Sequence, residues 1–408
     1  MKYIERALER KFLRMNDFFK VLLLTGARQV GKTTMLQHLA KGTGRRYVSM
    51  DRADYRDLAE RDPVLFFQTF PPPLLIDEIQ KAPKLLEQIK IMADESEEKG
   101  QFWLTGSQHF SMMRRVQETL AGRVGILHLY PFSQAEIEGR LPVEIPDFSI
   151  SSLREKSAGK KPPLTEEIFR RIWTGGMPQV QETDEELRSL YFSSYIETYL
   201  FRDILEMGEI RDTVRFMKFL RASAALTGQQ VNYATLAEAS DISQPTAKNW
   251  LQLLSGLGII YLLQPYFNNE LKRLVKSPKL YFCDTGLCAF LSFWPTPETL
   301  MVGAASGHYY ENYVLMELIR NFSASPQKAE FSYYRDSRKN EIDIVIETGG
   351  ELHPLEIKKS ASPDSREIRK FKLLENPIIP TGSGGILCMA PEPLPLDEKN
   401  AIIPSWIF

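Results

Sequence analysis

The sequence predicts an α/β protein in which a parallel sheet comes first and a helical part and a mixed α/β part follow. Three observations carry this prediction. Short apolar segments alternate with helical segments between residues 21 and 129, a glycine-rich loop follows the first apolar segment, and an acidic pair ends the third. Such alternation is typical of parallel sheets covered by helices on both faces, because parallel strands need a helix-length connection.

Five segments are expected to be strands of this sheet. They are Val21–Leu24, Arg46–Met50, Leu74–Ile76, Phe102–Thr105 and Ile126–Leu129. Helices are expected between them, for example at Thr33–Ala40 and Leu85–Glu98. Ligands of open parallel sheets bind at the carboxyl ends of the strands, so the polar residues after these segments are the first candidates for a site.

The first strand runs into Gly-Ala-Arg-Gln-Val-Gly-Lys-Thr-Thr at residues 26–34, which fits the phosphate-loop pattern G-x-x-x-x-G-K-[ST]. The glycines let backbone N–H groups converge on an anion, and the following helix adds the positive end of its dipole. Lys32 supplies a point charge and Thr33 a hydroxyl for Mg²⁺. The residues expected to bind the nucleotide are Gly26, Ala27, Arg28, Gln29, Val30, Gly31, Lys32, Thr33 and Thr34.

The third strand ends in two carboxylates, Asp77 and Glu78. A nucleoside triphosphate site needs such a pair, with Asp77 for the metal ion and Glu78 to polarise the attacking water. The loop and the acidic pair together predict a P-loop NTPase core over residues 1–140. The motifs by themselves leave ATP and GTP open.

Composition restricts the remaining classes of function. A length of 408 residues suggests two or three domains, and a formal net charge of -1 means that nucleic acid would have to bind at a local patch. Cys283, Cys288 and Cys388 have no metal-ligand spacing and predict free thiols. No apolar run approaches the ~18 residues that span a bilayer, so we expect a cytoplasmic protein without a membrane partner.

Two further parts follow the core. Residues 141–163 are rich in Pro, Ser and Lys and are expected to be a loop, whereas 166–210 is expected to be mostly helical. The turn Trp173–Pro178 interrupts this helical part with Gly-Gly and Pro. We expect residues 141–210 to form a helical lid or linker on the nucleotide domain.

Residues 211–275 are expected to form a winged helix-turn-helix: a short helix at 232–240, a tight turn, a helix at 244–257 and a wing strand at 259–263. Polar residues of the second helix are able to read base edges: Gln244, Thr246, Lys248 and Asn249. Cations for phosphates follow in the wing and beyond it: Lys272, Arg273, Lys276 and Lys279. Because the second helix carries a single cation, docking of a protein is an equal alternative to DNA binding.

Residues 276–408 mix strands and helices, and a hairpin turn is expected at 348–351. Symmetric pairing about this turn places Asp343 opposite Glu356, with Cβ atoms ~5 Å apart. Lys358 shares the face of Glu356 because side chains alternate along a strand. Two carboxylates and a lysine suit metal-dependent cleavage of a phosphodiester. The alternative is a solvated hairpin face with an ion pair.

The order of these motifs resembles the AAA-type ATPases of bacteria and archaea that carry an uncharacterised C-terminal domain, a winged helix followed by a PD-(D/E)XK nuclease-like module. The resemblance spans nearly all of the chain. It rests on the phosphate loop and on the segments 75–83, 104–107, 120–123, 279–287 and 356–358. It implies ATP as the nucleotide, and it implies that Asp343, Glu356 and Lys358 match the nuclease-like core, with Glu311 added from a preceding helix.

The resemblance also suggests two catalytic residues of the ATPase. Ser107 is expected to contact the terminal phosphate or the attacking water, with Thr105 as the next choice and a plain polar loop as the alternative. Arg123 is a candidate cation for the transition state, in cis or in trans, and an ordinary surface salt bridge is its alternative.

The expected function is hydrolysis of Mg-ATP that repositions C-terminal domains on DNA or on a protein partner. Two alternatives remain: an ATP-regulated, metal-dependent DNA endonuclease, and a non-catalytic regulator that ATP switches between DNA- or protein-binding states. The motifs are compatible with an oligomer.

Overall fold

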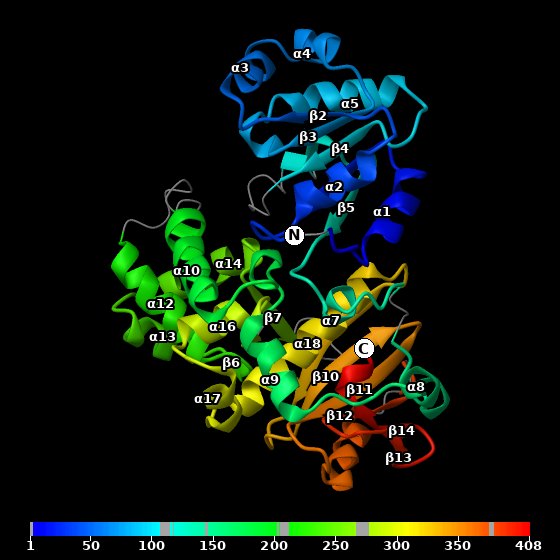
Figure 1. Cartoon of the computed structure of the whole chain (residues 1–408), viewed down its shortest axis with the longest axis vertical. Coiled ribbons are helices and arrows are strands. Elements are labelled where there is room, and N and C mark those ends of the chain that lie inside the picture. Colours follow the sequence, from blue (N-terminus) through cyan, green and yellow to red (C-terminus); the bar gives the residue numbers. More distant parts are fainter. Residues whose placement is uncertain are drawn as a thin grey trace.

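The computed structural model describes residues 3–106, 115–116, 118–142, 146–201, 204, 212–266, 277–374 and 379–408. These residues build a five-stranded sheet and a nine-stranded sheet. Figure 1 shows the first sheet at the top of the molecule, with the second sheet and a group of helices below it.

The five-stranded sheet is parallel throughout, in the order β2-β3-β4-β1-β5. Its strands are β1 (Val21–Thr25), β2 (Arg46–Ser49), β3 (Leu74–Asp77), β4 (Phe102–Thr105) and β5 (Val124–His128). All five predicted strands are confirmed within two residues at either end. The carboxyl ends of these strands therefore meet at one edge of the sheet, as the prediction of a site there requires.

Helices cover both faces of this sheet. They are α1 (Glu9–Asn16), α2 (Lys32–Ala40), α3 (Ala53–Arg61), α4 (Pro63–Thr69) and α5 (Leu85–Glu95). Leu22 and Leu24 of β1 pack into one hydrophobic cluster with α1 and α2, whereas Val21 and Leu23 pack into another with α3, α4 and α5. Side chains alternate along a strand, so a β1 that is apolar at every position is the consequence of burial on both faces.

A short helix, α7 (Gln134–Ile137), precedes the lid region. The lid region contains α8 (Ile150–Ser157), α9 (Thr165–Thr174), α10 (Glu185–Tyr195) and a π-helix (Ile196–Leu200). The expectation of a loop over 141–163 is wrong at α8. Ser149 caps this helix by accepting a hydrogen bond from the Ser152 amide, and Leu153 is buried. This cap and the buried leucine stabilise a short helix in a segment whose composition is typical of loops.

The described residues of the next region include α12 (Thr213–Ala225), α13 (Tyr233–Ala239) and α14 (Gln244–Gly256). The two helices predicted at 232–240 and 244–257 are confirmed as α13 and α14. Asn232 and Ser243 cap them, and Trp250 packs edge-on against two phenylalanines of α12. The predicted cations Lys272, Arg273 and Lys276 lie outside the described residues.

The nine-stranded sheet joins this helical region to the rest of the chain, in the order β13-β14-β12-β11-β10-β9-β7-β8-β6. Its strands are β6 (Gln229–Gln230), β7 (Ile260–Pro265), β8 (Lys279–Phe282), β9 (Ala329–Arg335), β10 (Glu341–Thr348), β11 (Glu351–Lys358), β12 (Gly384–Cys388), β13 (Leu394–Pro395) and β14 (Asn400–Pro404). β8 lies beyond the expected boundary at residue 275, yet it pairs with β6 and β7, and β7 pairs with β9. The two expected C-terminal domains thus share one continuous sheet.

Three helices accompany the second sheet: α16 (Thr285–Leu291), α17 (Pro297–Val302) and the long, largely buried α18 (Ser306–Ala324). In Figure 1, α18 runs between the ATPase half and the strands β10 and β11. The three cysteines are buried and free, as expected. Among the described residues, we find no helix with the length and apolarity that a membrane crossing requires.

Candidate functional site

The phosphate loop lies between β1 and α2, where glycines allow backbone that other residues rarely adopt. Gly26 has a φ of 146° and Gly31, the N-cap of α2, a φ of 96°. A Cβ at Gly26 would lie 2.2 Å from the carbonyl oxygen of Leu129, so this position admits no side chain. The loop conformation is therefore built into the sequence at both of its glycines.

Lys32 is a buried cation at the start of α2. Its Nζ donates to the carbonyl oxygens of Gly26 (2.9 Å) and Ala27 (2.8 Å), and the residue is 7% exposed. Burial first, and then the charge of Lys32, lower the pKa of His128 at the end of β5 to about 4. The ammonium is thus fixed beside the loop, where a phosphate oxygen could replace the carbonyl partners.

Asp77 gathers three hydroxyl groups at the end of β3. Its Oδ1 accepts hydrogen bonds from Thr33 Oγ1 (2.7 Å) and from Thr105 Oγ1, and its Oδ2 accepts one from the Tyr47 hydroxyl (3.0 Å). Carboxylate and hydroxyl oxygens are hard ligands of the kind that Mg²⁺ prefers. The predicted pair of Thr33 and Asp77 is brought together, and its donor set fits the metal ion of a nucleotide site.

Glu78 follows in a strained backbone conformation, with a φ of 58°. Its amide donates to Thr105 Oγ1 (3.1 Å), and its carboxylate accepts a hydrogen bond from Gln80. A non-glycine residue in this region persists where neighbours fix it, and such residues concentrate at functional sites. Thr105 therefore touches both acidic residues, whereas the predicted Ser107 lies outside the described residues.

Arg123 does not lie at this site, and a role for it in cis at the loop of its own chain is wrong. It precedes β5, and its carbonyl oxygen accepts a hydrogen bond from the amide of Val21 at the start of β1. The guanidinium pairs with Asp94, with Nη2 2.9 Å from Oδ2. The phosphate loop is at the opposite, carboxyl edge of a parallel sheet, so the surface ion pair expected as the alternative is what the structure contains.

Arg6 supports the loop from the N-terminal segment and was not expected from the sequence. Its Nη1 donates to the Val30 carbonyl (2.7 Å), its Nη2 to the Tyr130 carbonyl (2.7 Å), and its Nε pairs with Glu136 (3.0 Å). The residue is 4% exposed. An arginine ahead of the first strand gives no motif signal, because only folding brings it to the loop.

Tyr47 is the second residue that the sequence did not reveal. It lies on β2 next to β3, and burial, followed by the charge of Asp77, raises its pKa to about 12. A local sequence pattern does not determine the order of strands in a sheet, so β2 could not be predicted as the neighbour of β3.

The lid also reaches the site. A Cβ at Gly31 would lie 3.5 Å from Arg6 Nη1 and 4.0 Å from Pro178 Cγ of the lid.

A cavity of about 580 Å³ lies beside these elements. Its lining includes Tyr3, Arg6, Arg10, Glu136 and Glu182. Arg6 thus lines the cavity and also holds the phosphate loop, and Glu136 lines the cavity and pairs with Arg6.

The second predicted site lies in the hairpin of β10 and β11. The strand register runs from Thr348 opposite Glu351 to Ile344 opposite Leu355, which confirms the expected symmetric turn over this stretch. The ladder ends there, and beyond it the Asp343 carboxylate accepts a hydrogen bond from the Ile357 amide (2.9 Å). Asp343 and Glu356 lie on neighbouring strands, but the paired register ends before them, so their direct opposition stays a prediction.

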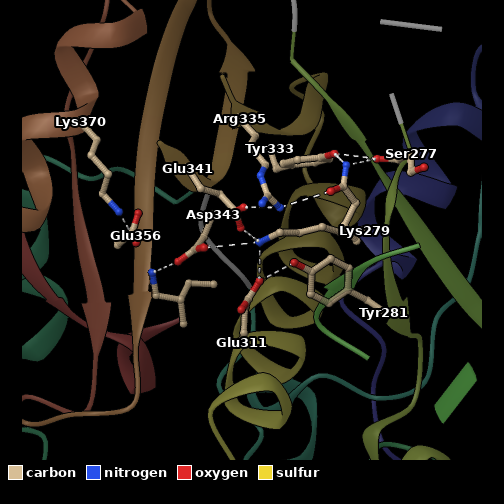
Figure 2. A network of polar contacts seen from close by, with 12 residues as sticks. Ser277, Lys279, Tyr281, Glu311, Tyr333, Arg335, Glu341, Asp343, Glu356 and Lys370 are labelled. Atoms are coloured by element: carbon tan, nitrogen blue, oxygen red, sulfur yellow. Dashed lines mark hydrogen bonds and ion pairs between the residues drawn. The ribbon is translucent and has the colours of Figure 1, made fainter. Parts of the chain in front are cut away.

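Lys279 of β8 was expected to contact DNA phosphates but is buried among carboxylates (Figure 2). Its Nζ pairs with Glu311 of α18 and with Glu341 and Asp343 of β10. Burial lowers the pKa of this ammonium, but the neighbouring groups, Tyr281 and then Glu311 foremost, raise it well above its usual value. An ammonium in this position is no longer available to nucleic acid, so the expected contact is wrong.

Glu356 also forms ion pairs with lysines. Lys358 and Lys370 each place Nζ 2.8 Å from Glu356 Oε1. Burial, and then the charge of Asp343, raise the pKa of Glu356 to about 7, against the effect of Lys358. Glu356 Oε2 is buried and has no hydrogen-bond partner among the described residues.

The predicted nuclease residues therefore lie close together, but their charges are matched by lysines. Glu311 and Asp343 face Lys279, and Glu356 faces Lys358 and Lys370. Within the described residues no group of three or more His, Cys, Asp or Glu side chains is placed to hold a metal ion. The expected metal site does not fit this arrangement, because ammonium groups occupy the space between the carboxylates.

The expected DNA-reading residues lie on α14. Gln244, Lys248 and Asn249 are exposed, and Thr246 is half-buried with its hydroxyl 2.8 Å from that of Ser243. The opposite side of α14 is buried through Trp250 and the leucines. The polar face is accessible, and its contact with DNA stays a prediction.

Comparison with known families divides the chain into three matched parts. A family model described as an AAA domain matches residues 18–138, and two models described as domains of unknown function match residues 165–298 and 306–408. Together with the loop, Lys32 and the Thr33–Asp77 pair, the first match supports an AAA-type ATPase.

Similar proteins occur in bacteria and archaea. The uncharacterized proteins Rv2008c of Mycobacterium tuberculosis and Mb2031c of Mycobacterium bovis are each 28% identical over 353 residues, which is 86% of this chain and 73% of theirs. The uncharacterized protein MJ1637 of Methanocaldococcus jannaschii is 23% identical over 296 residues, or 65% of this chain and 61% of its own. The similarity to the mycobacterial proteins extends beyond the AAA domain into the C-terminal parts.

Among solved structures, the Walker-type ATPase PABY2304 of Pyrococcus abyssi aligns with a TM-score of 0.44 and 16% identity, covering 71% of this chain and 96% of that one. RuvB of Thermotoga maritima aligns with a TM-score of 0.27 and 16% identity, covering 63% of this chain and 86% of that one. Scores this low do not place the whole chain in a fold shared with either protein.

Proposed function

We propose that this protein is an AAA-type ATPase that binds and hydrolyses Mg-ATP and uses the nucleotide cycle to reposition its C-terminal half. The observation that carries this proposal is the convergence of Lys32, Thr33 and Asp77 at the carboxyl edge of a parallel sheet. Mg²⁺ held by Thr33 and Asp77 would offset phosphate charge. Lys32 would hold the phosphates, and Glu78 would orient the attacking water.

Direct contacts between the halves support the coupling. Arg6 donates to the Val30 carbonyl of the loop and pairs with Glu136 of α7. Glu317 of α18 accepts a hydrogen bond from the Gln134 amide at the start of α7 (2.9 Å). A change in the loop therefore has a continuous polar route to α18, which is the kind of contiguous network that coupling needs.

A second route runs through the lid. Asp284, the N-cap of α16, accepts a hydrogen bond from the Gly176 amide (2.7 Å), and Pro178 two residues later lies beside Gly31. Arg188 of α10 donates to the Gly286 carbonyl (2.9 Å). The turn between α9 and α10 is thus fixed to α16 on one side and faces the phosphate loop on the other.

The exposed polar face of α14 supports binding of DNA or of a protein by the repositioned half. We favour this role over the endonuclease alternative, because the acidic residues of the hairpin are paired with Lys279, Lys358 and Lys370. A measurement of ATP hydrolysis distinguishes the ATPase from the non-catalytic regulator, because the regulator would bind ATP without hydrolysing it. A gel shift of short duplexes with and without ATP tests DNA as the partner.

The ATPase proposal is tested by phosphate release from Mg-ATP in the full chain and in Lys32→Ala. We expect the substitution to lower the rate by about two orders of magnitude or more, because the phosphates lose their fixed cation. Lys41→Ala is the matched control, since Lys41 is an exposed lysine at the far end of α2. Equal turnover in wild type and Lys32→Ala would contradict the proposal, and binding without turnover in the wild type would favour the regulator.

A further inference from the structure

A small cavity of about 20 Å³ lies where the ATPase half meets α18. Its lining includes Arg6 of the N-terminal segment, His128 at the end of β5, Ser133 before α7 and Arg320 of α18. These residues are far apart in the sequence. The cavity therefore marks a junction between the first sheet and the long helix.

Two nitrogen atoms of the lining residues are buried without a partner. They are His128 Nδ1 and Arg320 Nε, and neither has a hydrogen-bond partner within the part of the chain that the structure describes. Such atoms are costly, and native proteins usually satisfy them with a protein group or an ordered water. Because both side chains line the same cavity, one occupant would satisfy both nitrogens.

Other contacts hold the two side chains in place. Arg320 donates through Nη1 to Glu317 (2.6 Å) and through Nη2 to the Cys283 carbonyl (2.7 Å). The His128 ring packs edge-on against Tyr130, with ring centroids 4.2 Å apart. Turning either side chain toward another partner would break these contacts, so the occupant has to come to the nitrogens.

The chemistry of the two nitrogens restricts the occupant. The Nε of an arginine can only donate, whereas Nδ1 of a neutral imidazole can accept. Burial first, and then the charge of Lys32, lower the pKa of His128 to about 4, which keeps the ring neutral near pH 7. The occupant must therefore accept one hydrogen bond and donate another. A water molecule does both, whereas a halide ion only accepts.

Charge and size also favour water. The two arginines of the lining already pair with carboxylates, Arg6 with Glu136 (3.0 Å) and Arg320 with Glu317 (2.6 Å), so a neutral occupant is favoured over an ion. A cavity needs about 10–15 Å³ to hold a water, and this one provides about 20 Å³. The Ser133 hydroxyl, which accepts a hydrogen bond from the Glu136 amide (3.2 Å), has a proton to give to a third contact.

We propose that one buried water occupies this cavity, accepts a hydrogen bond from Arg320 Nε and donates one to His128 Nδ1. The water joins the last residue of β5 to α18. In the sheet, His128 pairs with Thr25, which directly precedes Gly26 of the phosphate loop. A part for this water in coupling the loop to α18 rests on the proposed function, whereas the water site itself does not.

The first test is a crystal structure of the nucleotide-free chain at a resolution that shows ordered waters. We expect one density peak at about 2.7–3.2 Å from both His128 Nδ1 and Arg320 Nε. A crystal soaked in bromide should show no anomalous peak at this position, which distinguishes a water from a halide. The same peak should be lost in crystals of His128→Phe, which keeps a ring but has no acceptor.

The second test is hydrogen exchange of residues 306–324 without nucleotide. We expect His128→Phe to speed this exchange about fivefold, the effect of losing one net hydrogen bond. Arg320→Lys keeps a cation for Glu317 but lacks Nε, and its effect should be smaller in His128→Phe than in wild type, because the two residues share one water. His38→Phe is the matched control, since His38 is an exposed histidine of α2, and its effect should multiply independently with that of Arg320→Lys.

Three results would overturn the proposal. They are clear density around both side chains with no peak between them, a bromide peak at the site, and effects of His128→Phe and Arg320→Lys that multiply independently. These measurements use no nucleotide. Their failure would leave the proposed ATPase intact, and a chain without turnover of Mg-ATP would leave the water site intact.

Discussion

Thr105 is the residue that connects the two acidic groups of the nucleotide site. Its hydroxyl donates to Asp77 and accepts a hydrogen bond from the Glu78 amide, and the residue is fully buried. A hydroxyl in this position fixes the direction of the carboxylate that we propose to bind the metal ion, and it fixes the strained backbone of the residue that we propose to polarise the water. Thr105 is thus a positioning residue, although it was expected only as the second choice for contact with the terminal phosphate.

Replacing Thr105 by Val should leave packing nearly unchanged but remove both hydrogen bonds. We expect turnover of Mg-ATP to fall about 10- to 100-fold, the usual effect of losing a group that orients a metal ligand. Thr105→Ser keeps the hydroxyl and should restore most of the rate. The test is the rate of phosphate release in each variant, with stability checked by thermal melts. A Thr105→Val variant that hydrolyses Mg-ATP at the wild-type rate would show that Thr105 is not a positioning residue.

At the residue scale, the sequence predicted those site residues that lie close to one another along the chain. Lys32 and Thr33 belong to one loop, and Asp77 with Glu78 ends one strand, so their pairing followed from the rule that parallel strands end at one edge. Arg6, Tyr47 and Lys279 reach their sites only through tertiary contacts. No local pattern distinguishes such residues from surface ones.

At the scale of elements, α18 links the ATPase half to the acidic cluster around Lys279. It carries Glu311 in the acidic cluster and, six residues later, Glu317 in contact with the start of α7. The rise between these residues is about 9 Å for an α-helix. Arg320 of the same helix pairs with Glu317 (2.6 Å) and donates to the Cys283 carbonyl (2.7 Å). A single rigid element therefore spans from the ATPase half to β10.

Glu317→Gln should weaken this link without touching the phosphate loop. Hydrogen exchange followed by mass spectrometry measures it: in wild type, Mg-ATP should protect both the loop and residues 306–324. In the variant, we expect protection of the loop to remain and protection of 306–324 to be lost, because a neutral amide holds Arg320 and the Gln134 amide less well.

Glu330→Gln is the matched control for this measurement, since Glu330 is an exposed residue of β9. Nucleotide-dependent protection of 306–324 that persists unchanged in Glu317→Gln would show that coupling does not pass through α18.

The elements with strong patterns were predicted well, and the weak ones were not. The central strands β1, β3 and β4 are nearly continuous apolar runs, which burial on both faces explains. The short helix α8 depends on one cap and one buried leucine, and its serines and lysines resemble a loop. The pairing of β7 with β9 is remote in sequence, so the single nine-stranded sheet could not be read from local periodicity.

At the scale of the whole molecule, one hydrophobic cluster extends from Leu8 in the N-terminal segment to Phe408 at the other end of the chain. It includes residues of α2, α9, α14, α18 and β11, so the ATPase half, the lid and the C-terminal sheet share packing. Interiors packed in this way move between discrete arrangements rather than deforming gradually. A nucleotide that changes the loop can therefore be expected to move large parts together.

Calorimetric titration of Mg-ATP into the intact chain tests the central claim most directly. We predict saturable binding of about one nucleotide per chain, abolished in Lys32→Ala and retained in Lys41→Ala, because the phosphates are held by the loop, its lysine and the metal ion anchored at Asp77. A folded wild-type chain that releases no heat with Mg-ATP or Mg-GTP would contradict the account.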